Sequence, residues 1–274
     1  MVRRMTQTSL LCRLAPLLLA ILLPDAGIAQ SQSDAVTGHL LPGWRLDNGH
    51  YMAALQLDMA PGWKTYWRAP GEAGIPPQFN WQGSTNLGAV AYHWPSPVVI
   101  KLNGLQSIAY HDQLVLPIEV TAADGNAPVT AALHLQIGVC KDICLPASLD
   151  FSVVLGGNEP DPLIIAALNH GPVTGDAAGL SSIVCTLTPI SDGMHLQANL
   201  TLPPFGTPET VVFETSDPTV WVATATEERK GAVLSAGADL VPPKGAPFVL
   251  DRSHVTVTVI GQGRSVEIKG CPAP

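Results

Sequence analysis

Cys140 and Cys144 lie four positions apart, directly after an alternating run from Ala131 to Val139 that predicts a β-strand. A disulfide between them does not fit within one regular element, because four residues of extended strand span about 13 Å and one helical turn also keeps the sulfurs apart. The chain must therefore turn tightly between them. We expect residues 141–143 to form the end of a hairpin whose second strand begins at Leu149.

This short bridge is either a structural clip or a redox centre. In the chain-entropy model, closing so short a loop stabilises the fold by about 2 kcal/mol, whereas a bridge from Cys185 to Cys271 gives about 4.6 kcal/mol. We therefore expect Cys185–Cys271 to be structural, joining the first and last strands of a domain. A disulfide at a hairpin tip is accessible to a partner thiolate, which favours redox chemistry for the short bridge. The spacing alone leaves both interpretations open.

The N-terminus predicts a secretory signal peptide over residues 1–29. Three arginines precede the apolar run Leu14 to Leu23, and a small-residue cleavage site, Ala26 to Ala29, follows. Removal of this segment takes Cys12 with it and leaves four cysteines, an even number suited to an oxidising compartment. No later segment reaches the roughly 18 uninterrupted apolar residues of a membrane helix, so we expect no stable membrane insertion.

The composition limits the fold classes and the kinds of partner that the chain is expected to have. Only 13% of residues are charged, the formal net charge is -8, and neither a basic patch nor a nucleic-acid-binding motif is present, which argues against nucleic acid as a partner. The chain has 25 Gly and 25 Pro residues, too many for a helical bundle. They suit short strands joined by tight turns, so we expect an all-β protein.

The pattern predicts two β-sandwiches separated by a linker. Residues 35–156 contain short strands, such as Tyr51 to Met59, at the density of an immunoglobulin-like β-sandwich. Residues 157–179 form the linker and contain one short helix, with Asp161 as N-cap, Pro162 in the first position and Gly171-Pro172 as the stop. Residues 180–272 predict a second, smaller β-sandwich that ends in a hairpin around residues 261–263.

Two further residue groups suggest ligands less strongly. Trp63, Tyr66 and Trp67 offer flat faces for a sugar, but Trp63 and Trp67 share one face of a strand, which is more typical of a core. His93, His111 and His134, joined by Met52 or Met59 and the thiols, suggest a copper site. Scattered histidines of β proteins more often lie at the surface, so no metal site is expected.

Three motifs in this order resemble the N-terminal periplasmic domain of the DsbD thiol:disulfide interchange family, including its copper-tolerance relatives of the ScsB type. They are P-G-W-K-T-Y-W-R-A-P-G-E-A-G-I-P-P from Pro61, A-Y-H-D-Q-L-V-L-P-I-E-V from Ala109, and V-C-K-D-I-C-L-P-A from Val139. The resemblance covers residues 35–155 and is weaker beyond them, although ScsB-type relatives also carry a second β domain.

The resemblance implies a periplasmic thiol-disulfide oxidoreductase without a cofactor. Its cysteine pair receives two electrons from a thioredoxin-like protein or a membrane thiol reductase and passes them to a periplasmic disulfide protein. Cys144 would be the interprotein nucleophile and Cys140 the resolving thiol. A cap over residues 101–107, with Leu102 and Leu105 as apolar lids, would shield the cysteines. Together with Tyr110 on the strand that follows, it would also meet the partner.

Two departures from the family qualify this expectation. The sequence ends at Pro274 without membrane helices or a C-terminal thioredoxin-like domain, so the electron source is expected to be another polypeptide. The cysteine spacing is also shorter than in the best-known members. The rival hypothesis is a non-catalytic periplasmic binding or copper-handling module whose two disulfides are both structural.

Overall fold

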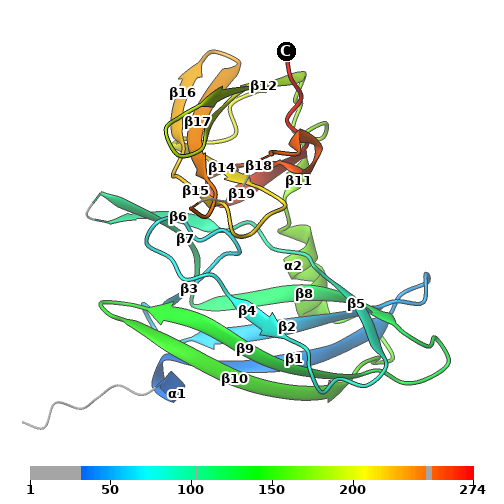
Figure 1. The fold of residues 1–274 in the computed structure, drawn as a ribbon. Helices are drawn as coiled ribbons and strands as arrows, with labels where there is room; N and C mark the ends of the chain where they lie inside the picture. The colour runs from blue at the N-terminus through cyan, green and yellow to red at the C-terminus, as the bar shows by residue number, and fades with distance from the viewer. Residues whose placement is uncertain (1–31, 103, 245–248) are drawn as a thin grey trace, which may run out of the picture. The chain divides into compact units, whose positions relative to one another are not determined.

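The first part of the chain folds into two antiparallel sheets that pack face to face (Figure 1). The computed structural model describes residues 32–102, 104–244 and 249–274, so the predicted signal peptide of residues 1–29 lies outside the described residues. After a short helical turn, α1 (Gln32–Ala35), one sheet has the strand order β1-β2-β8-β5. Its strands are β1 (Val36–Arg45), β2 (Tyr51–Met59), β8 (Gln113–Ala122) and β5 (Leu87–Tyr92).

The second sheet of this sandwich holds both cysteines of the short pair. Its order is β10-β9-β3-β7-β6, and β4 also pairs with β9. The strands are β3 (Lys64–Tyr66), β4 (Gln78–Asn80), β6 (Val98–Leu102), β7 (Leu105–His111), β9 (Thr130–Cys140) and β10 (Cys144–Val154). The expected immunoglobulin-like β-sandwich is confirmed.

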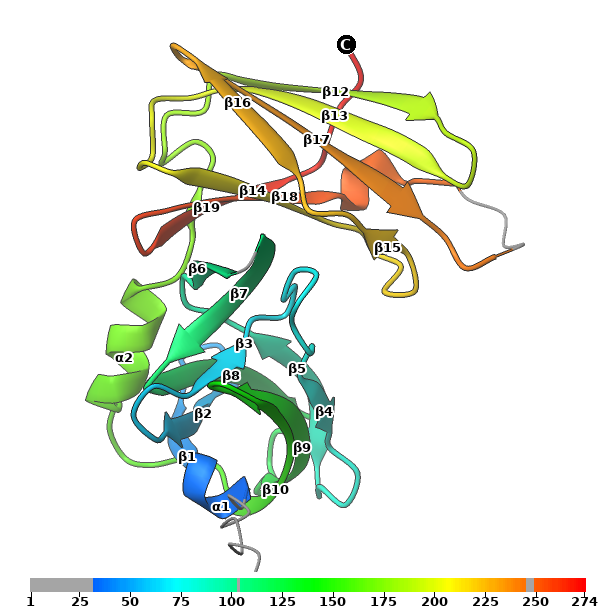
Figure 2. The same ribbon diagram turned by 90° about the vertical axis from the view of Figure 1, so that its left-hand side faces the viewer.

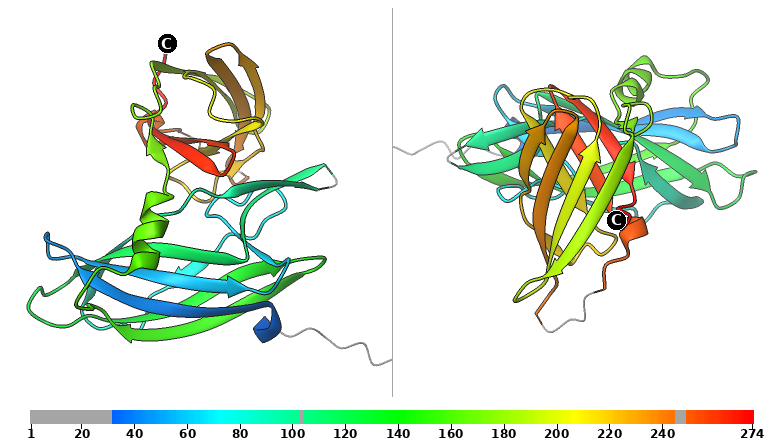
Figure 3. Two further views of the ribbon diagram at one scale, coloured as in Figure 1. Left: turned by 180° about the vertical axis from the view of Figure 1, so that it is seen from behind. Right: turned by 90° about the horizontal axis from the view of Figure 1, so that it is seen from above.

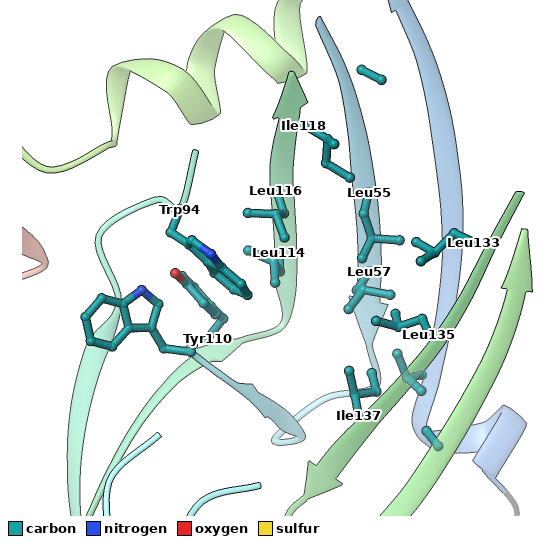
Figure 4. Packing of buried hydrophobic residues seen from close by; sticks show 14 of the residues in the cluster. Leu55, Leu57, Trp94, Tyr110, Leu114, Leu116, Ile118, Leu133, Leu135 and Ile137 are labelled. Atoms are coloured by element: carbon teal, nitrogen blue, oxygen red, sulfur yellow. The ribbon is translucent and has the colours of Figure 1, made fainter. Parts of the chain in front are cut away.

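The core of the first sandwich is built from inward-facing residues of both sheets. Leu55 and Leu57 of β2 lie opposite Leu133 and Leu135 of β9, and all four are at most 1% exposed (Figure 4). Alternate residues of a strand point to opposite faces, so this spacing of two places each pair on one face. The sequence pattern of β2 therefore matches its place in the sandwich.

A short helix covers the other face of β2. Helix α2 (Pro162–Asn169) packs on β8, and its Ile164 is buried against Met52 and Ala54 of β2 (Figure 3). The Asp161 carboxylate accepts hydrogen bonds from the backbone N–H groups of Leu163, at 2.8 Å, and Ile164. The predicted N-cap, the first-position proline and the end before Gly171 are thus confirmed.

The second part of the chain forms another β-sandwich (Figure 2). One sheet has the order β11-β19-β18-β14, and the other has the order β12-β13-β17-β15 with β16 also paired to β17. The strands are β11 (Val173–Thr174), β12 (Ser182–Pro189), β13 (Met194–Thr201), β14 (Glu209–Glu214), β15 (Trp221–Val222), β16 (Thr226–Lys230), β17 (Val233–Val241), β18 (Thr256–Gly261) and β19 (Arg264–Lys269), with a 3-10 turn η1 (Arg252–His254) before β18.

Cys185 of β12 and Cys271, just after β19, form a disulfide with Cα atoms 5.4 Å apart. Both residues are at most 1% exposed, and the Arg252 side chain donates to the Cys185 carbonyl. The bridge therefore joins the two ends of this sandwich within its own core.

The two sandwiches are joined by a buried apolar contact. The chain beyond residue 30 forms one compact unit, and Ile260 of β18 is buried in the core cluster of the first sandwich. Among the described residues, no helix is long and apolar enough to cross a membrane.

Candidate redox site

The cysteine pair closes the hairpin between β9 and β10. Cys140 is the last residue of β9, Cys144 is the first of β10, and the two are directly paired and disulfide-bonded, with Cα atoms 4.1 Å apart. Residues 141–143 form the tip, as the spacing predicts. The second strand begins at Cys144 rather than Leu149, because β10 lies at the end of its sheet, where Pro146 is tolerated.

The two cysteines of this bridge differ in exposure. Cys140 is 1% exposed, whereas Cys144 lies at the exposed hairpin tip beside Ile143, which is 57% exposed. An incoming thiolate therefore reaches Cys144 first.

Tyr66 contacts both sulfurs from the neighbouring strand. β3 pairs with β9 through Lys64 and Thr65, so the next residue, Tyr66, lies beside the end of β9. Its hydroxyl donates a hydrogen bond to Cys140 Sγ at 3.0 Å and lies 3.6 Å from Cys144 Sγ. Burial raises the pKa of Tyr66 above its usual value near 10, so the hydroxyl stays protonated and remains a donor at neutral pH.

An apolar wall covers the buried side of the bridge. Cys140, Tyr66 and Ala109 form a small buried cluster, and Ile100 packs against it. Ile100 lies on β6 and Ala109 on β7, so the β6–β7 hairpin supplies this wall. The side chains around Cys140 thus exclude water while Cys144 stays open.

The predicted cap residues occupy different positions. Leu102 and Leu105 pair with each other at the tip of the β6–β7 hairpin and are 62% and 51% exposed; residue 103 lies outside the described residues. Neither leucine belongs to the buried cluster around Cys140, and the β6 residue that packs against that cluster is Ile100.

Tyr110 is not a surface residue. It is 7% exposed, its ring stacks on Trp94, and its hydroxyl donates to the Pro95 carbonyl at 2.7 Å (Figure 4). The expectation that Tyr110 contributes to a partner-binding surface is therefore corrected, because its strand position turns the ring into the core of the sandwich.

The aromatic motif serves two purposes. Trp63 and Trp67 are each 2% exposed and belong to the core, which confirms the expectation for them and excludes a sugar platform. Tyr66 has the opposite parity on the same segment and belongs to the cysteine cluster. Sequence reasoning missed this role, although the parity was a signal.

The tip of the hairpin places its two charged residues differently. The Lys141 ammonium donates to the Pro61 carbonyl at 3.2 Å and lies over the turn at Gly62. Asp142 is exposed at the tip. The charges that the sequence places beside the cysteines are thus directed to the backbone and to solvent.

The suggested copper ligands do not come together. His93 and His134 each pair with a separate carboxylate, and His111 is exposed. Met52 and Met59 are buried in different core clusters. In the part of the chain that the structure describes, no group of three or more His, Cys, Asp or Glu side chains has an arrangement that would hold a metal ion.

Comparison with known proteins finds a family match over the region that contains the Cys140–Cys144 pair. Residues 38–155 match the family model described as "Thiol:disulfide interchange protein DsbD, N-terminal". The fold is similar to the crystal structure of the N-terminal periplasmic domain of ScsB from Proteus mirabilis, with a TM-score of 0.64, 23% identity, and coverage of 90% of this chain and 96% of that one. This structural match extends well beyond residue 155, so it includes the fold of the second sandwich. No match was found among curated proteins.

Proposed function

We propose, from the premise that residues 38–155 are an N-terminal domain of the DsbD family, that this chain carries electrons between periplasmic proteins by thiol-disulfide exchange at Cys140 and Cys144. One observation supports this most directly. The bridge joins one exposed cysteine, Cys144, to one buried cysteine, Cys140, whose sulfur accepts a hydrogen bond from Tyr66.

Reduction begins when a partner thiolate attacks Cys144 Sγ. The Cys140–Cys144 bond breaks, its electron pair stays on Cys140 Sγ as a thiolate, and a mixed disulfide joins the partner to Cys144. The Tyr66 hydroxyl donates to the sulfur that becomes the anion, which favours this step because hydrogen bonds to charged groups are the stronger ones. The partner's second thiolate then attacks the partner's own sulfur in the mixed disulfide and releases Cys144, leaving the partner oxidised and this pair reduced by two electrons.

Delivery of the electrons uses the same residues in reverse. The Cys144 thiolate attacks one sulfur of an acceptor disulfide, the acceptor's other sulfur leaves as a thiolate, and a mixed disulfide forms. The Cys140 thiolate then attacks Cys144 Sγ, the original bridge re-forms, and the attached acceptor sulfur leaves as a second thiolate, so the acceptor is reduced by two electrons. In this scheme Cys144 is the interprotein nucleophile and Cys140 is the resolving thiol. Only a nucleophile on the exposed side reaches another protein without movement of the β6–β7 hairpin.

The partner proposed for both half-reactions is a thioredoxin-like periplasmic protein or a membrane thiol reductase. Two exposed apolar residues, Ile143 at the hairpin tip and Ile75 against Gly138 of β9, suit contact with such a partner. We likewise propose that residues 1–29 direct export to the periplasm. The chain is then divided into a redox domain over residues 35–156, a linker over 157–179 and a second β domain over 180–272.

The competing function is a binding module in which both bridges only stabilise the fold. The Cys185–Cys271 bridge fits that description, because both of its residues are buried in a core. The Cys140–Cys144 bridge fits it poorly, since the short loop offers little stabilisation and one sulfur is exposed.

Trapping of a mixed disulfide tests the proposal. The probe is a thioredoxin-fold protein with a single active-site cysteine, activated as its mixed disulfide with nitrothiobenzoate, so that each exchange releases a coloured thiol. With Cys140→Ser, the exposed Cys144 thiolate should displace the dye and form a covalent complex that disappears on reduction. With Cys144→Ser, the buried Cys140 should form little complex.

The two variants control for each other's folding. Each removes the same bridge, so each should cost no more than about 2 kcal/mol in the entropy model. Faster trapping by Cys144→Ser than by Cys140→Ser would reverse the assignment of roles. Trapping by neither would favour the purely structural bridge.

A further inference from the structure

Arg68 joins the segment of Tyr66 to the second sandwich. Its guanidinium donates to both carboxylate oxygens of Glu214, at 2.8 and 2.9 Å, and to Glu267 at 2.7 Å. Glu214 ends β14 and Glu267 lies on β19, and the three side chains are only 22–25% exposed. Bidentate pairing of this kind fixes orientation as well as distance.

The same guanidinium is fixed on the redox side. It lies 4.4 Å from the ring centre of Trp67, whose backbone N–H donates to the Ile108 carbonyl at 3.0 Å. The backbone N–H of Ile108 in turn donates to the Pro70 carbonyl. Arg68 therefore lies in a stretch that is hydrogen-bonded to β7 both before and after it. The next residue of β7, Ala109, packs on Cys140 and Tyr66. Arg68 therefore lies two residues after Tyr66, in a stretch bonded to β7, the strand that carries Ala109.

The β6–β7 hairpin has further polar links to the second sandwich. Just before β6, the Ser96 hydroxyl lies 2.8 Å from that of Ser265 on β19. At the other end of β6, Lys101 interacts electrostatically with Glu227 of β16; burial raises the pKa of Glu227, and the Val211 N–H and the Lys101 charge oppose that rise. Both ends of β6 thus face groups of the second sandwich.

We propose that the second sandwich holds the β6–β7 hairpin closed over Cys140, with Arg68, clamped by Glu214 and Glu267, as the main positioning residue. The inference rests on the proposed function, because it gives the second sandwich a part in exchange at this bridge. It states that the contacts of Arg68 with Glu214 and Glu267 are coupled to the packing of the β6–β7 hairpin over Cys140. When the carboxylates release Arg68, the stretch bonded to β7 loses an anchor, and Ile100 and Ala109 expose the sulfur beneath them more often.

Alkylation of Cys140 measures this opening directly and requires no redox partner. In the Cys144→Ser background, Cys140 is a single free thiol beneath the hairpin, and iodoacetamide reaches it when the hairpin opens. Adding Glu214→Gln and Glu267→Gln should speed alkylation roughly 5-fold or more, the lower end of typical coupling between sites. Ser265→Ala, a milder change, should shift the rate in the same direction.

Glu209→Gln is the matched control. Glu209 forms a bidentate pair with Arg229, and both residues lie in the second sandwich, so Glu209→Gln should weaken that sandwich while leaving Arg68, Glu214 and Glu267 in place. Alkylation in this variant should match the Cys144→Ser parent at a temperature where circular dichroism shows all variants folded. Equal acceleration by Glu209→Gln, or parent-like rates in both clamp variants, would overturn the inference.

The alkylation experiment and the test of the proposed redox function can fail independently of each other. A wild-type bridge that exchanges with the thioredoxin-fold probe, together with clamp variants that alkylate like the parent, contradicts the clamp alone. A bridge that does not exchange, together with accelerated alkylation, contradicts the redox function and leaves a clamp that holds a structural hairpin.

Discussion

The Tyr66 hydroxyl lies 3.0 Å from Cys140 Sγ and donates a hydrogen bond to it. This contact gives the buried sulfur a proton donor at the position where negative charge develops when Cys144 is attacked. Tyr66 itself is 3% exposed, so water does not replace the donor if the hydroxyl is removed. The contact therefore matters more for exchange than for the resting disulfide.

Tyr66→Phe should slow reduction of the Cys140–Cys144 bridge by dithiothreitol. A hydrogen bond to a charged group contributes about 1.5–3 kcal/mol, which corresponds to a loss of roughly tenfold or more in rate. Mass-tagged alkylation at timed intervals would measure it. Tyr110→Phe is the matched control, because Tyr110 is also a buried tyrosine but its hydroxyl bonds to the Pro95 carbonyl. Equal rates for Tyr66→Phe and wild type would show that the contact has no part in exchange.

Stability at high pH should also depend on Tyr66. Burial raises the pKa of its hydroxyl in the folded protein, whereas the unfolded chain titrates near its usual value of about 10. The stability that this difference contributes is fully present below about pH 10 and is lost as the pH rises through the raised pKa. Urea unfolding between pH 8 and about 11 should therefore show a smaller decline for Tyr66→Phe than for wild type. If Tyr66→Phe and wild type lost the same stability over this pH range, the loss would come from the titration of another group.

The wall over the bridge should depend on Ile100 more than on the tip leucines. Ile100→Ala removes a side chain that packs against the buried cluster of Cys140, Tyr66 and Ala109, so alkylation of Cys140 in the Cys144→Ser background should accelerate. Leu102→Ala removes a side chain that is 62% exposed and should leave that rate unchanged. The reverse order would restore Leu102 as the lid over the cysteines.

Local signals of the sequence predicted the elements that local chemistry determines. The four-residue spacing required a hairpin end at Cys140 and Cys144, and the hairpin is present. The Asp161–Pro162 start and the Gly171 stop gave α2 its bounds within the chain. In each case the deciding interaction lies within a few residues.

Contacts between distant segments were not predictable in the same way. Tyr66 reaches Cys140 because β3 pairs with β9, and no short pattern encodes that pairing. The family resemblance implied a lid at Leu102 and Leu105, but both are exposed at the hairpin tip, and Ile100 is the β6 residue that packs against the Cys140 cluster. The pairing of Arg68 with Glu214 joins residues 146 positions apart, which only the assembled sheets bring together.

A glutathione redox titration of the native protein tests the central claim most directly. Mass-tagged alkylation would follow both bridges in the same sample, so the buried Cys185–Cys271 bridge is the internal reference. The account predicts that Cys140–Cys144 has a midpoint potential above about -300 mV and is reduced while Cys185–Cys271 stays oxidised. If both bridges instead stayed oxidised at every glutathione ratio until the protein unfolded, Cys140–Cys144 would be a structural clip and the redox function would be contradicted.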